Sequence, residues 1–284
     1  MVVLCKIISN KMMNYKLLGK SGLKVSELCL GTMGFGKEWG WGNDFDSSKK
    51  IFEAFANAGG NFIDTANRYT DGTSEKYIGD FIKEDRDHFV IATKYALKDA
   101  DTNNVNGSGT NRKNMMRSIE GSLKRMNTDY IDLFYLHIWD NLSPIDEVMR
   151  AMEDLIRQGK VNYIGISDTP AWIVSRGNTY AEMLGWNQFV ALQVEYSLLQ
   201  RTPERDLLPM AKSYGMTVVP WAPLAGGALT GKYLKGNPGR IKEGSTRLND
   251  RAVGITKEVM AIANEIGCEP SSVALQWMMN HRDF

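Results

Sequence analysis

The chain has 284 residues and a formal net charge of +1, from 34 basic and 33 acidic side chains, and 43% of its residues are hydrophobic. This is the composition of an ordinary globular protein, and the lack of a basic stripe or of an apolar run near the ~20 residues that span a bilayer argues against nucleic acid and membrane as partners. The cysteines, Cys5, Cys29 and Cys268, are far apart and lack CxxC or metal-ligand spacing, which indicates a reducing, cytoplasmic setting with no disulfide framework and no metal site.

The chain is expected to begin with an extension and a hairpin. Residues 1–12 are mildly apolar but lack the basic start and the small-residue cleavage site of a signal peptide. One domain is therefore predicted over residues 13–284. Within it, residues 14–27 predict a β-hairpin whose turn is Gly19-Lys20-Ser21-Gly22.

Seven short apolar runs follow the hairpin. Each is nearly continuous in its hydrophobicity, which is typical of strands in a parallel sheet buried on both faces. The predicted strands are residues 28–32, 62–64, 89–93, 131–136, 161–166, 191–194 and 216–221.

Amphipathic segments between these runs predict helices. The first of them has Ser47 or Ser48 as its N-cap, and the one that begins at Pro144 ends before Gly159. The predicted helices are residues 47–58, 74–83, 111–126, 144–158, 170–184, 203–214, 256–266 and 270–280. The stretch 97–110, rich in Asn, Asp and Gly, predicts a loop at the functional ends of the strands.

This alternation is typical of either a doubly wound sheet or a (β/α)8 barrel. The glycine-rich stretch 31–36 does not have the G-x-G-x-x-G spacing of a dinucleotide-binding turn. Reactive side chains follow several different strands, which favours the barrel. Because seven strands are found before the sequence stops, we expect an α/β protein of the (β/α)8 TIM-barrel class, with an N-terminal hairpin and without the eighth strand and final helix.

Three of the predicted strands lead into reactive side chains, namely Asp64, Lys94 and His137. A strand-end lysine can form a Schiff base, tune the pKa of a neighbour or make a structural salt bridge. Tyr69 favours tuning, because an ammonium held by a carboxylate makes a phenol a usable proton donor. His137 would orient a carbonyl oxygen, although a lone histidine at such a position is more often a hydrogen-bonded core residue.

Eight short motifs occur in order along the chain. They are N-F-I-D-T-A at 61–66 with Tyr69, G-T-S-E at 72–75, I-A-T-K at 91–94, Y-L-H at 135–137, G-K-V at 159–161, I-G-I-S at 164–167, Q-V-E-Y-S-L-L at 193–199 and W-A-P-L at 221–224. Together they resemble the aldo-keto reductase superfamily, and the resemblance covers residues 13–284. The sequences at residues 38–41 and 168–172 are most similar to the aryl-alcohol-dehydrogenase-like branch, which is related to the potassium-channel β-subunits.

The resemblance implies a (β/α)8 barrel that uses a nicotinamide cofactor, NADP(H) or alternatively NAD(H). In the family, Tyr69 would be the general acid, Lys94 and Asp64 would tune it, and His137 would orient the carbonyl group. Thr70 stands where glycine is common, which is expected to alter the shape of that loop.

The resemblance also implies residues that bind the cofactor. Ser167, Asp168 and Gln193 would contact the nicotinamide carboxamide, although many relatives have asparagine in place of Asp168. Trp221 would stack on the nicotinamide, or alternatively would be an ordinary aromatic at the end of the barrel. The other implied contacts are Gly31, Thr32, Met33 and Asp64 beside the nicotinamide, and Ala222, Pro223, Leu224 and Gly226 beside the pyrophosphate, with Lys232 and Arg247 as its positive partners.

Four aromatic residues, Trp39, Trp41, Tyr95 and Trp139, are expected in loops after strands. They would line the substrate pocket, or alternatively pack within those loops. A pocket lined by aromatic rings favours a small aryl or apolar carbonyl compound, or the corresponding alcohol, as the partner.

Two functions from different classes follow. The first is an NADP(H)-dependent oxidoreductase that reduces aldehydes or ketones by hydride transfer, with Tyr69 as the acid. The second is a non-catalytic barrel that senses cofactor or serves as a scaffold, like the potassium-channel β-subunits. A lyase that uses Lys94 as a Schiff base is disfavoured because it needs neither Tyr69 nor Asp64. In the family, the eighth strand and the following helix hold the 2'-phosphate, and we expect this segment to be absent, so the sequence does not select between NADPH and NADH.

Overall fold

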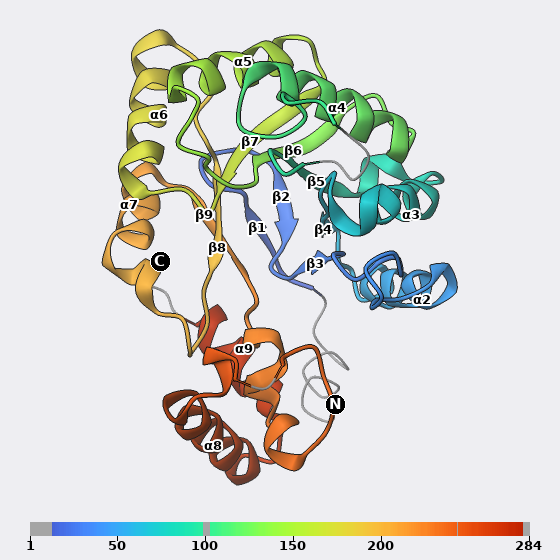
Figure 1. Ribbon diagram of the computed structural model, residues 1–284, viewed down its shortest axis with the longest axis vertical. Coiled ribbons are helices and arrows are strands. Elements are labelled where there is room, and N and C mark those ends of the chain that lie inside the picture. The colour runs from blue at the N-terminus through green and yellow to red at the C-terminus, as the bar shows by residue number, and fades with distance from the viewer. Residues whose placement is uncertain (1–12, 99–102, 243, 281–284) are drawn as a thin grey trace. The chain divides into compact units, whose positions relative to one another are not determined.

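A computed structural model describes residues 13–98, 103–242 and 244–280 (Figure 1). The predicted N-terminal extension, residues 1–12, lies outside these described residues. The described chain divides into two compact units. The larger unit comprises residues 13–192 and 213–217, and the smaller unit comprises residues 193–212 and 218–280.

The predicted hairpin is confirmed. Strands β1 (Tyr15–Leu17) and β2 (Lys24–Ser26) pair antiparallel, with Tyr15 opposite Ser26. The turn needs glycine at position 19, because its φ is +57° and a Cβ there would lie 2.3 Å from the carbonyl oxygen of Val190. The backbone N–H of Gly19 donates to Thr217 Oγ1 at 2.7 Å. The hairpin is thereby attached to the starts of two later strands.

The other strands form one seven-stranded sheet in the order β3-β4-β5-β6-β7-β8-β9. Four successive pairs, from β3–β4 to β6–β7, are parallel, with Gly31 opposite Asp64 and Lys94 opposite Tyr135. The α/β class and a topology consistent with a (β/α)8 barrel are therefore confirmed. The strands are β3 (Cys29–Gly31), β4 (Phe62–Asp64), β5 (Val90–Tyr95), β6 (Ile131–Leu136), β7 (Val161–Ser167), β8 (Ala191–Glu195) and β9 (Thr217–Trp221).

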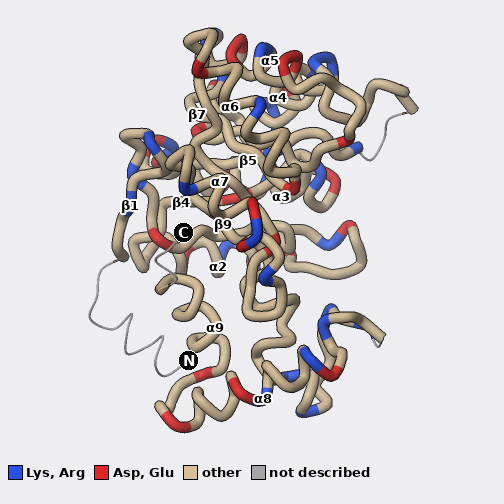
Figure 2. Tube along the Cα trace, turned by 90° about the vertical axis from the view of Figure 1, so that its left-hand side faces the viewer, with Lys and Arg blue, Asp and Glu red and all other residues tan. Residues whose placement is uncertain are grey.

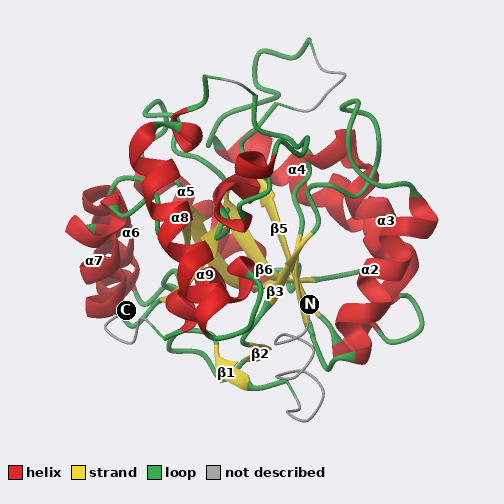
Figure 3. Ribbon diagram, turned by 90° about the horizontal axis from the view of Figure 1, so that it is seen from below, coloured by secondary structure: helices red, strands yellow, loops and turns green. Residues whose placement is uncertain are grey.

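Helices alternate with the strands, and within the larger unit helices α2 to α6 lie outside the strands (Figure 3). The helices are α2 (Phe45–Asn57), α3 (Thr73–Ile82), α4 (Arg112–Met126), α5 (Ile145–Arg157), α6 (Ala171–Leu184), α7 (Leu207–Tyr214), α8 (Asp250–Glu265) and α9 (Pro270–Met279).

Three predicted helix starts are wrong. Helix α7 begins at Leu207 and not at residue 203, because a separate 3-10 turn occupies Thr202–Arg205. The other two starts are set by side-chain caps. Helix α2 is capped by Asp44, whose carboxylate accepts from the backbone N–H of Ser47 at 3.0 Å, and not by Ser47 or Ser48. Helix α8 begins six residues before the predicted start because Asn249 caps it, accepting from the backbone N–H of Ala252 at 2.9 Å. In both cases the side-chain cap, and not the first apolar residue, decides where the helix begins.

The core of the larger unit lies along β4, β5 and β6, which are buried at every position. Such burial on both faces is the reason for their continuous hydrophobicity. The smaller unit has its own apolar cluster, in which Ala225, Leu229, Val259 and Ala274 are buried. Each unit therefore removes apolar surface from water by itself.

Charge is distributed over the helices of the larger unit. Basic and acidic segments alternate along α4 and α5 in Figure 2, and Arg112 and Arg150 both pair with Asp154 there. Among the described residues, no helix is long and apolar enough to cross a bilayer.

Candidate active site

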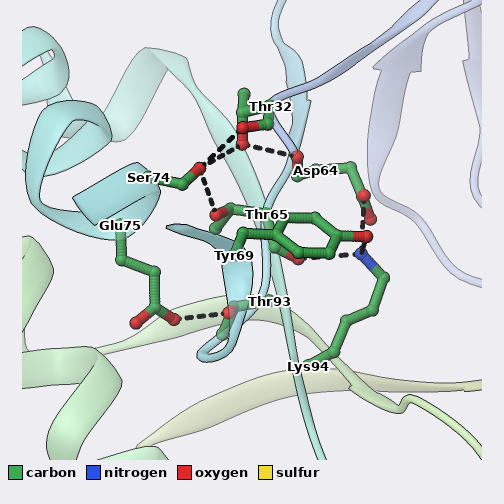
Figure 4. A network of polar contacts seen from close by, with 8 residues as sticks. All are labelled: Thr32, Asp64, Thr65, Tyr69, Ser74, Glu75, Thr93 and Lys94. Atoms are coloured by element: carbon green, nitrogen blue, oxygen red, sulfur yellow. Dashed lines mark hydrogen bonds and ion pairs between the residues drawn. The ribbon is translucent and has the colours of Figure 1, made fainter. Parts of the chain in front are cut away.

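Lys94 is the centre of the candidate site. Its ammonium, completely buried, donates to Asp64 Oδ2 at 2.6 Å, to the carbonyl oxygen of Thr65 at 2.8 Å and to the Tyr69 hydroxyl at 3.3 Å (Figure 4). Asp64 ends β4 and Lys94 lies near the end of the neighbouring strand β5. Since parallel strands end at the same edge of a sheet, this register brings the two side chains together.

His137 directly follows β6 and completes the predicted set of four. Its ring packs edge-on against the ring of Tyr69, with 5.8 Å between centroids. Its backbone N–H donates to the carbonyl oxygen of Tyr95 at 3.0 Å, while its Nδ1 has no hydrogen-bond partner among the described residues. Burial, and then the charge of Lys94, lower the pKa of His137 to about 3. The imidazole is therefore neutral at physiological pH.

Burial keeps the proton of Tyr69 in place, although a charged lysine lies beside the phenol. Burial alone would lower the pKa of Lys94, but Asp64 and Tyr69 outweigh it, so the pKa of Lys94 is raised and the lysine is charged. Burial raises the pKa of Tyr69, Lys94 opposes this, and the pKa ends above its ordinary value. The expected acid-strengthening effect of Lys94 is thus present but does not dominate. Tyr69 is a protonated phenol beside a fixed ammonium, a group that can donate a proton.

The turn after Tyr69 is strained. Thr70 and Asp71 have φ of +45° and +56°, a left-handed conformation that is unfavourable for a β-branched residue. The hydroxyl of Thr70 donates to the carbonyl oxygen of Phe35 at 2.5 Å and accepts from the backbone N–H of Ser74 at 3.2 Å. These bonds explain how threonine is held at this position, and they attach the turn to the loop after β3.

Two of the predicted aromatic residues lie together in that loop. The Trp39 ring is 5.9 Å from the Trp41 ring and packs edge-on against the Tyr69 ring at 6.5 Å. Its indole N–H donates to Asp71 at 3.2 Å, and the Arg68 guanidinium lies 5.7 Å from its ring centroid. Trp39 is thus held beside Tyr69 from two sides, as a pocket wall would be.

Trp139 and Tyr95 have different positions. Trp139 lies after β6, where its backbone N–H donates to the carbonyl oxygen of Asp168 at 3.5 Å. The prediction that Tyr95 lies in a loop is wrong. It ends β5, is completely buried, stacks on Phe134 and donates its hydroxyl to the carbonyl oxygen of Thr110 at 3.2 Å. Because successive strand residues face opposite sides, Tyr95 points away from the face that Lys94 uses.

The residues predicted to lie beside the nicotinamide differ in their exposure to solvent. Gly31 is exposed and Met33 is half-buried, but Thr32 is completely buried. The Thr32 hydroxyl donates to the carbonyl oxygen of Asp64 at 2.9 Å and contacts Ser74, so it is used inside the protein and is not offered to a ligand. Ser167 is buried, and Asp168 has a left-handed φ of +40°.

The smaller unit contains the predicted pyrophosphate contacts. Gly226 and Gly227 have φ of +67° and +93° in the turn after Trp221, Ala222, Pro223 and Leu224. A Cβ on Gly227 would lie 3.2 Å from the Lys232 ammonium, and one on Gly226 would lie 3.3 Å from the Arg247 guanidinium. Consecutive left-handed glycines beside cations suit an anion. Arg247 also pairs with Glu195, whereas Lys232 has no carboxylate partner among the described residues.

The rest of the predicted cofactor set in the smaller unit lies on the last two strands. Gln193 is a buried residue of β8, and Trp221 is the half-buried last residue of β9. The carbonyl oxygen of Trp221 accepts from the backbone N–H of Tyr196 at 3.4 Å. No group of three or more potential metal ligands occurs among the residues described.

A polar network that the sequence did not predict lies behind Tyr69 (Figure 4). The Ser74 hydroxyl lies 2.8 Å from that of Thr32 and 2.9 Å from that of Thr65. Glu75 accepts from Thr93 Oγ1 at 2.6 Å and pairs with Arg125 at 2.5 Å. The sequence signal for this network is the adjacent polar pair Ser74 and Glu75 at the start of a helix, which could have indicated buried partners.

Comparisons with known proteins show the family to which this chain belongs. The sequence model described as "Aldo/keto reductase family" matches residues 27–283. The chain is 39% identical over 280 residues to the "Aryl-alcohol dehydrogenase [NADP(+)]" of Phanerodontia chrysosporium, which covers 91% of this chain and 73% of that protein. It is 37% identical to norsolorinic acid reductase B of Dothistroma septosporum, covering 95% and 72% of the two chains. It is 36% identical to a putative aryl-alcohol dehydrogenase of Saccharomyces cerevisiae, covering 92% and 77%.

Proposed function

We propose that this chain, which belongs to the aldo/keto reductase family and is an oxidoreductase, reduces small aromatic aldehydes or ketones with NADPH. The buried contact of Lys94 with Asp64 and Tyr69 is the observation that carries this proposal. It places a proton donor and a fixed positive charge at one point, as the reduction of a carbonyl group requires.

Each residue of the set has a separate task in this proposal. Tyr69 donates its proton to the carbonyl oxygen as negative charge develops there. Lys94 stabilises the phenolate that is left, and Asp64 keeps Lys94 charged and oriented. The neutral imidazole of His137 donates a hydrogen bond to the same oxygen, which fixes the carbonyl group against Tyr69.

The cofactor, when bound, supplies the hydride. The turn at Gly226 and Gly227, with Lys232 beside it, has the donor set that suits its pyrophosphate. Ser167, Asp168 and Gln193 are proposed to hold the carboxamide, and Trp221 to stack on the ring. NADPH is preferred over NADH in this proposal because one similar protein is named as an NADP(+) enzyme.

The proposed substrate class rests on the wall beside Tyr69. Trp39 packs edge-on against the phenol ring, and Trp41 packs against Trp39. Flat aryl groups pack well against such rings. The names of the similar proteins, an aryl-alcohol dehydrogenase and a norsolorinic acid reductase, are compatible with aromatic substrates here.

The test is turnover by the purified protein. Loss of NADPH absorbance would be followed with 4-nitrobenzaldehyde and a panel of aryl and alkyl carbonyl compounds, and NADPH binding would be measured by fluorescence. We expect turnover that Tyr69→Phe lowers by roughly 10²-fold or more, the range of general acid catalysis. NADPH binding without turnover of any compound would instead favour a cofactor-sensing or scaffold barrel.

A further inference from the structure

A buried carboxylate lies behind the turn that carries Tyr69. Glu75, in the first turn of α3, is completely excluded from solvent. Its Oε1 accepts from Thr93 Oγ1 at 2.6 Å (Figure 4). Its Oε2 accepts from Arg125 Nε at 2.5 Å. An ionised carboxylate is buried only when it is paired and hydrogen-bonded. These contacts therefore fix the start of α3 against β5 and α4.

The strand that Glu75 contacts is the one that carries Lys94. Thr93 and Lys94 are neighbours on β5, and their side chains point to opposite faces. Thr93 faces Glu75, while Lys94 faces Asp64 and Tyr69. A shift of α3 along this contact would move Tyr69 relative to Lys94.

The link between Tyr69 and α3 cannot fix that distance by itself. Thr70, Asp71 and Gly72 all have positive φ, which is strained for the first two. A strained turn keeps its conformation only when contacts on both sides hold it. Arg125 supplies one of these contacts, because a Cβ on Gly72 would lie 2.8 Å from its Cδ.

We propose that Glu75 is a positioning residue for carbonyl reduction, which acts through Thr93 and Arg125 to set the distance between the Tyr69 hydroxyl and the Lys94 ammonium. The inference rests on the proposed function, since it assigns Tyr69 as the acid. Glu75 does not touch the substrate. Its effect is therefore on kcat and on the pH at which kcat changes, and not on the binding of substrate.

The sharpest variant is Thr93→Val, which removes one hydroxyl of a buried side chain and leaves the Glu75–Arg125 pair intact. We expect kcat to fall about tenfold, because small displacements of reacting groups are costly. The Michaelis constants for NADPH and aldehyde should stay unchanged, and the alkaline limb of the kcat–pH profile should move because the coupling of Lys94 to Tyr69 changes. Thr93→Ser keeps the hydroxyl and should have the wild-type kcat and the wild-type kcat–pH profile.

A second comparison separates positioning from stability. Glu75→Gln should lower kcat and the melting temperature, and adding Arg125→Gln should recover much of the melting temperature without recovering kcat. The matched control is Glu153→Gln, because Glu153 is a buried carboxylate of α5 that pairs with Arg157 and accepts from Asn187. It should lose stability and keep the wild-type kcat.

The outcomes distinguish this inference from the proposed function. If Tyr69→Phe is inactive while Thr93→Val and Glu75→Gln keep the wild-type kcat and pH profile, the positioning role is wrong and the reductase assignment stands. If Thr93→Ser does not restore kcat, the positioning role of Glu75 is also contradicted. If Tyr69→Phe is as active as the wild type, the proposed function itself fails.

Discussion

Lys94 and Asp64 form a buried ion pair with 2.6 Å between Nζ and Oδ2, in which the lysine side chain has no solvent exposure and the aspartate side chain has 11%. Removing one member of such a pair leaves an uncompensated charge in the interior. The pair is therefore important both for stability and for keeping Lys94 charged beside Tyr69.

Asp64→Asn should accordingly lower the free energy of unfolding by about 3–5 kcal/mol and lower kcat. Urea denaturation and aldehyde turnover would measure the two effects. Glu53→Gln is the control, because the Lys49–Glu53 pair is half exposed at 3.8 Å and should contribute less than about 0.5 kcal/mol. Equal stabilities of the two variants would contradict the prediction.

The state of His137 gives a pH prediction. Its pKa is about 3 in the folded protein and near 6.5 when exposed. Because the folded pKa is lowered, the unfolded chain binds a proton between these values, and stability is lost as pH falls below about 6.5. Between pH 7 and pH 5 this should cost about 2 kcal/mol, at 1.36 kcal/mol per pH unit below 6.5. In urea denaturation, His137→Gln should lose about 2 kcal/mol less unfolding free energy than the wild type between pH 7 and pH 5. An identical loss in both proteins would show that the pKa of His137 is not lowered in the folded state.

Thr70 tests the strain in the turn. Thr70→Gly relieves the left-handed conformation, whereas Thr70→Ala keeps it, and both lose the hydroxyl bonds to Phe35 and Ser74. Because a left-handed residue with a Cβ costs about 1–2 kcal/mol, the alanine variant should be less stable than the glycine variant by that amount in chemical denaturation. Equal stabilities would mean that the turn relaxes when the hydroxyl is removed.

Much of the fold could be predicted because its signals are local. Short apolar runs located every strand, and three strand ends brought Asp64, Lys94 and His137 to one edge. The position of Tyr95 could not be predicted in this way, because β5 extends two residues beyond the predicted run and therefore includes Tyr95. Successive residues of a strand face opposite sides, so Tyr95 and Lys94 point to different faces of the sheet.

The contacts of Glu75 could not be predicted from the sequence for a different reason. Thr93 and Arg125 lie 18 and 50 residues from Glu75 in sequence, on the separate elements β5 and α4, so no periodicity within one element relates them to Glu75. A buried polar contact of this kind depends on how helices pack against strands. A polar pair at the start of a helix can indicate that buried partners exist, but which residues they are is known only from the tertiary structure.

Trp39 should contribute to selection of aromatic substrates. Trp39→Ala removes the ring that packs against Tyr69 and is expected to raise KM for 4-nitrobenzaldehyde about fivefold, the equivalent of about 1 kcal/mol of aromatic contact. KM for a small alkyl aldehyde should change much less. Trp172→Ala is the control, since Trp172 is 63% exposed on α6. An equal effect on both aldehydes would show that Trp39 acts on the shape of the turn and not on the substrate.

Lys232 should bind the cofactor through its charge. Its ammonium lies beside the left-handed Gly227 and has no carboxylate partner among the described residues, so it is available to a phosphate. Lys232→Met is expected to raise the Kd for NADPH about tenfold or more, as a charged hydrogen bond contributes about 1.5–3 kcal/mol. Because salt screens such a contact, added salt should weaken binding more in the wild type than in the variant. Lys235→Met, in the same segment, should leave both the Kd and its salt dependence unchanged. Fluorescence titration measures both quantities, and an unchanged Kd for Lys232→Met would exclude this lysine from the cofactor site.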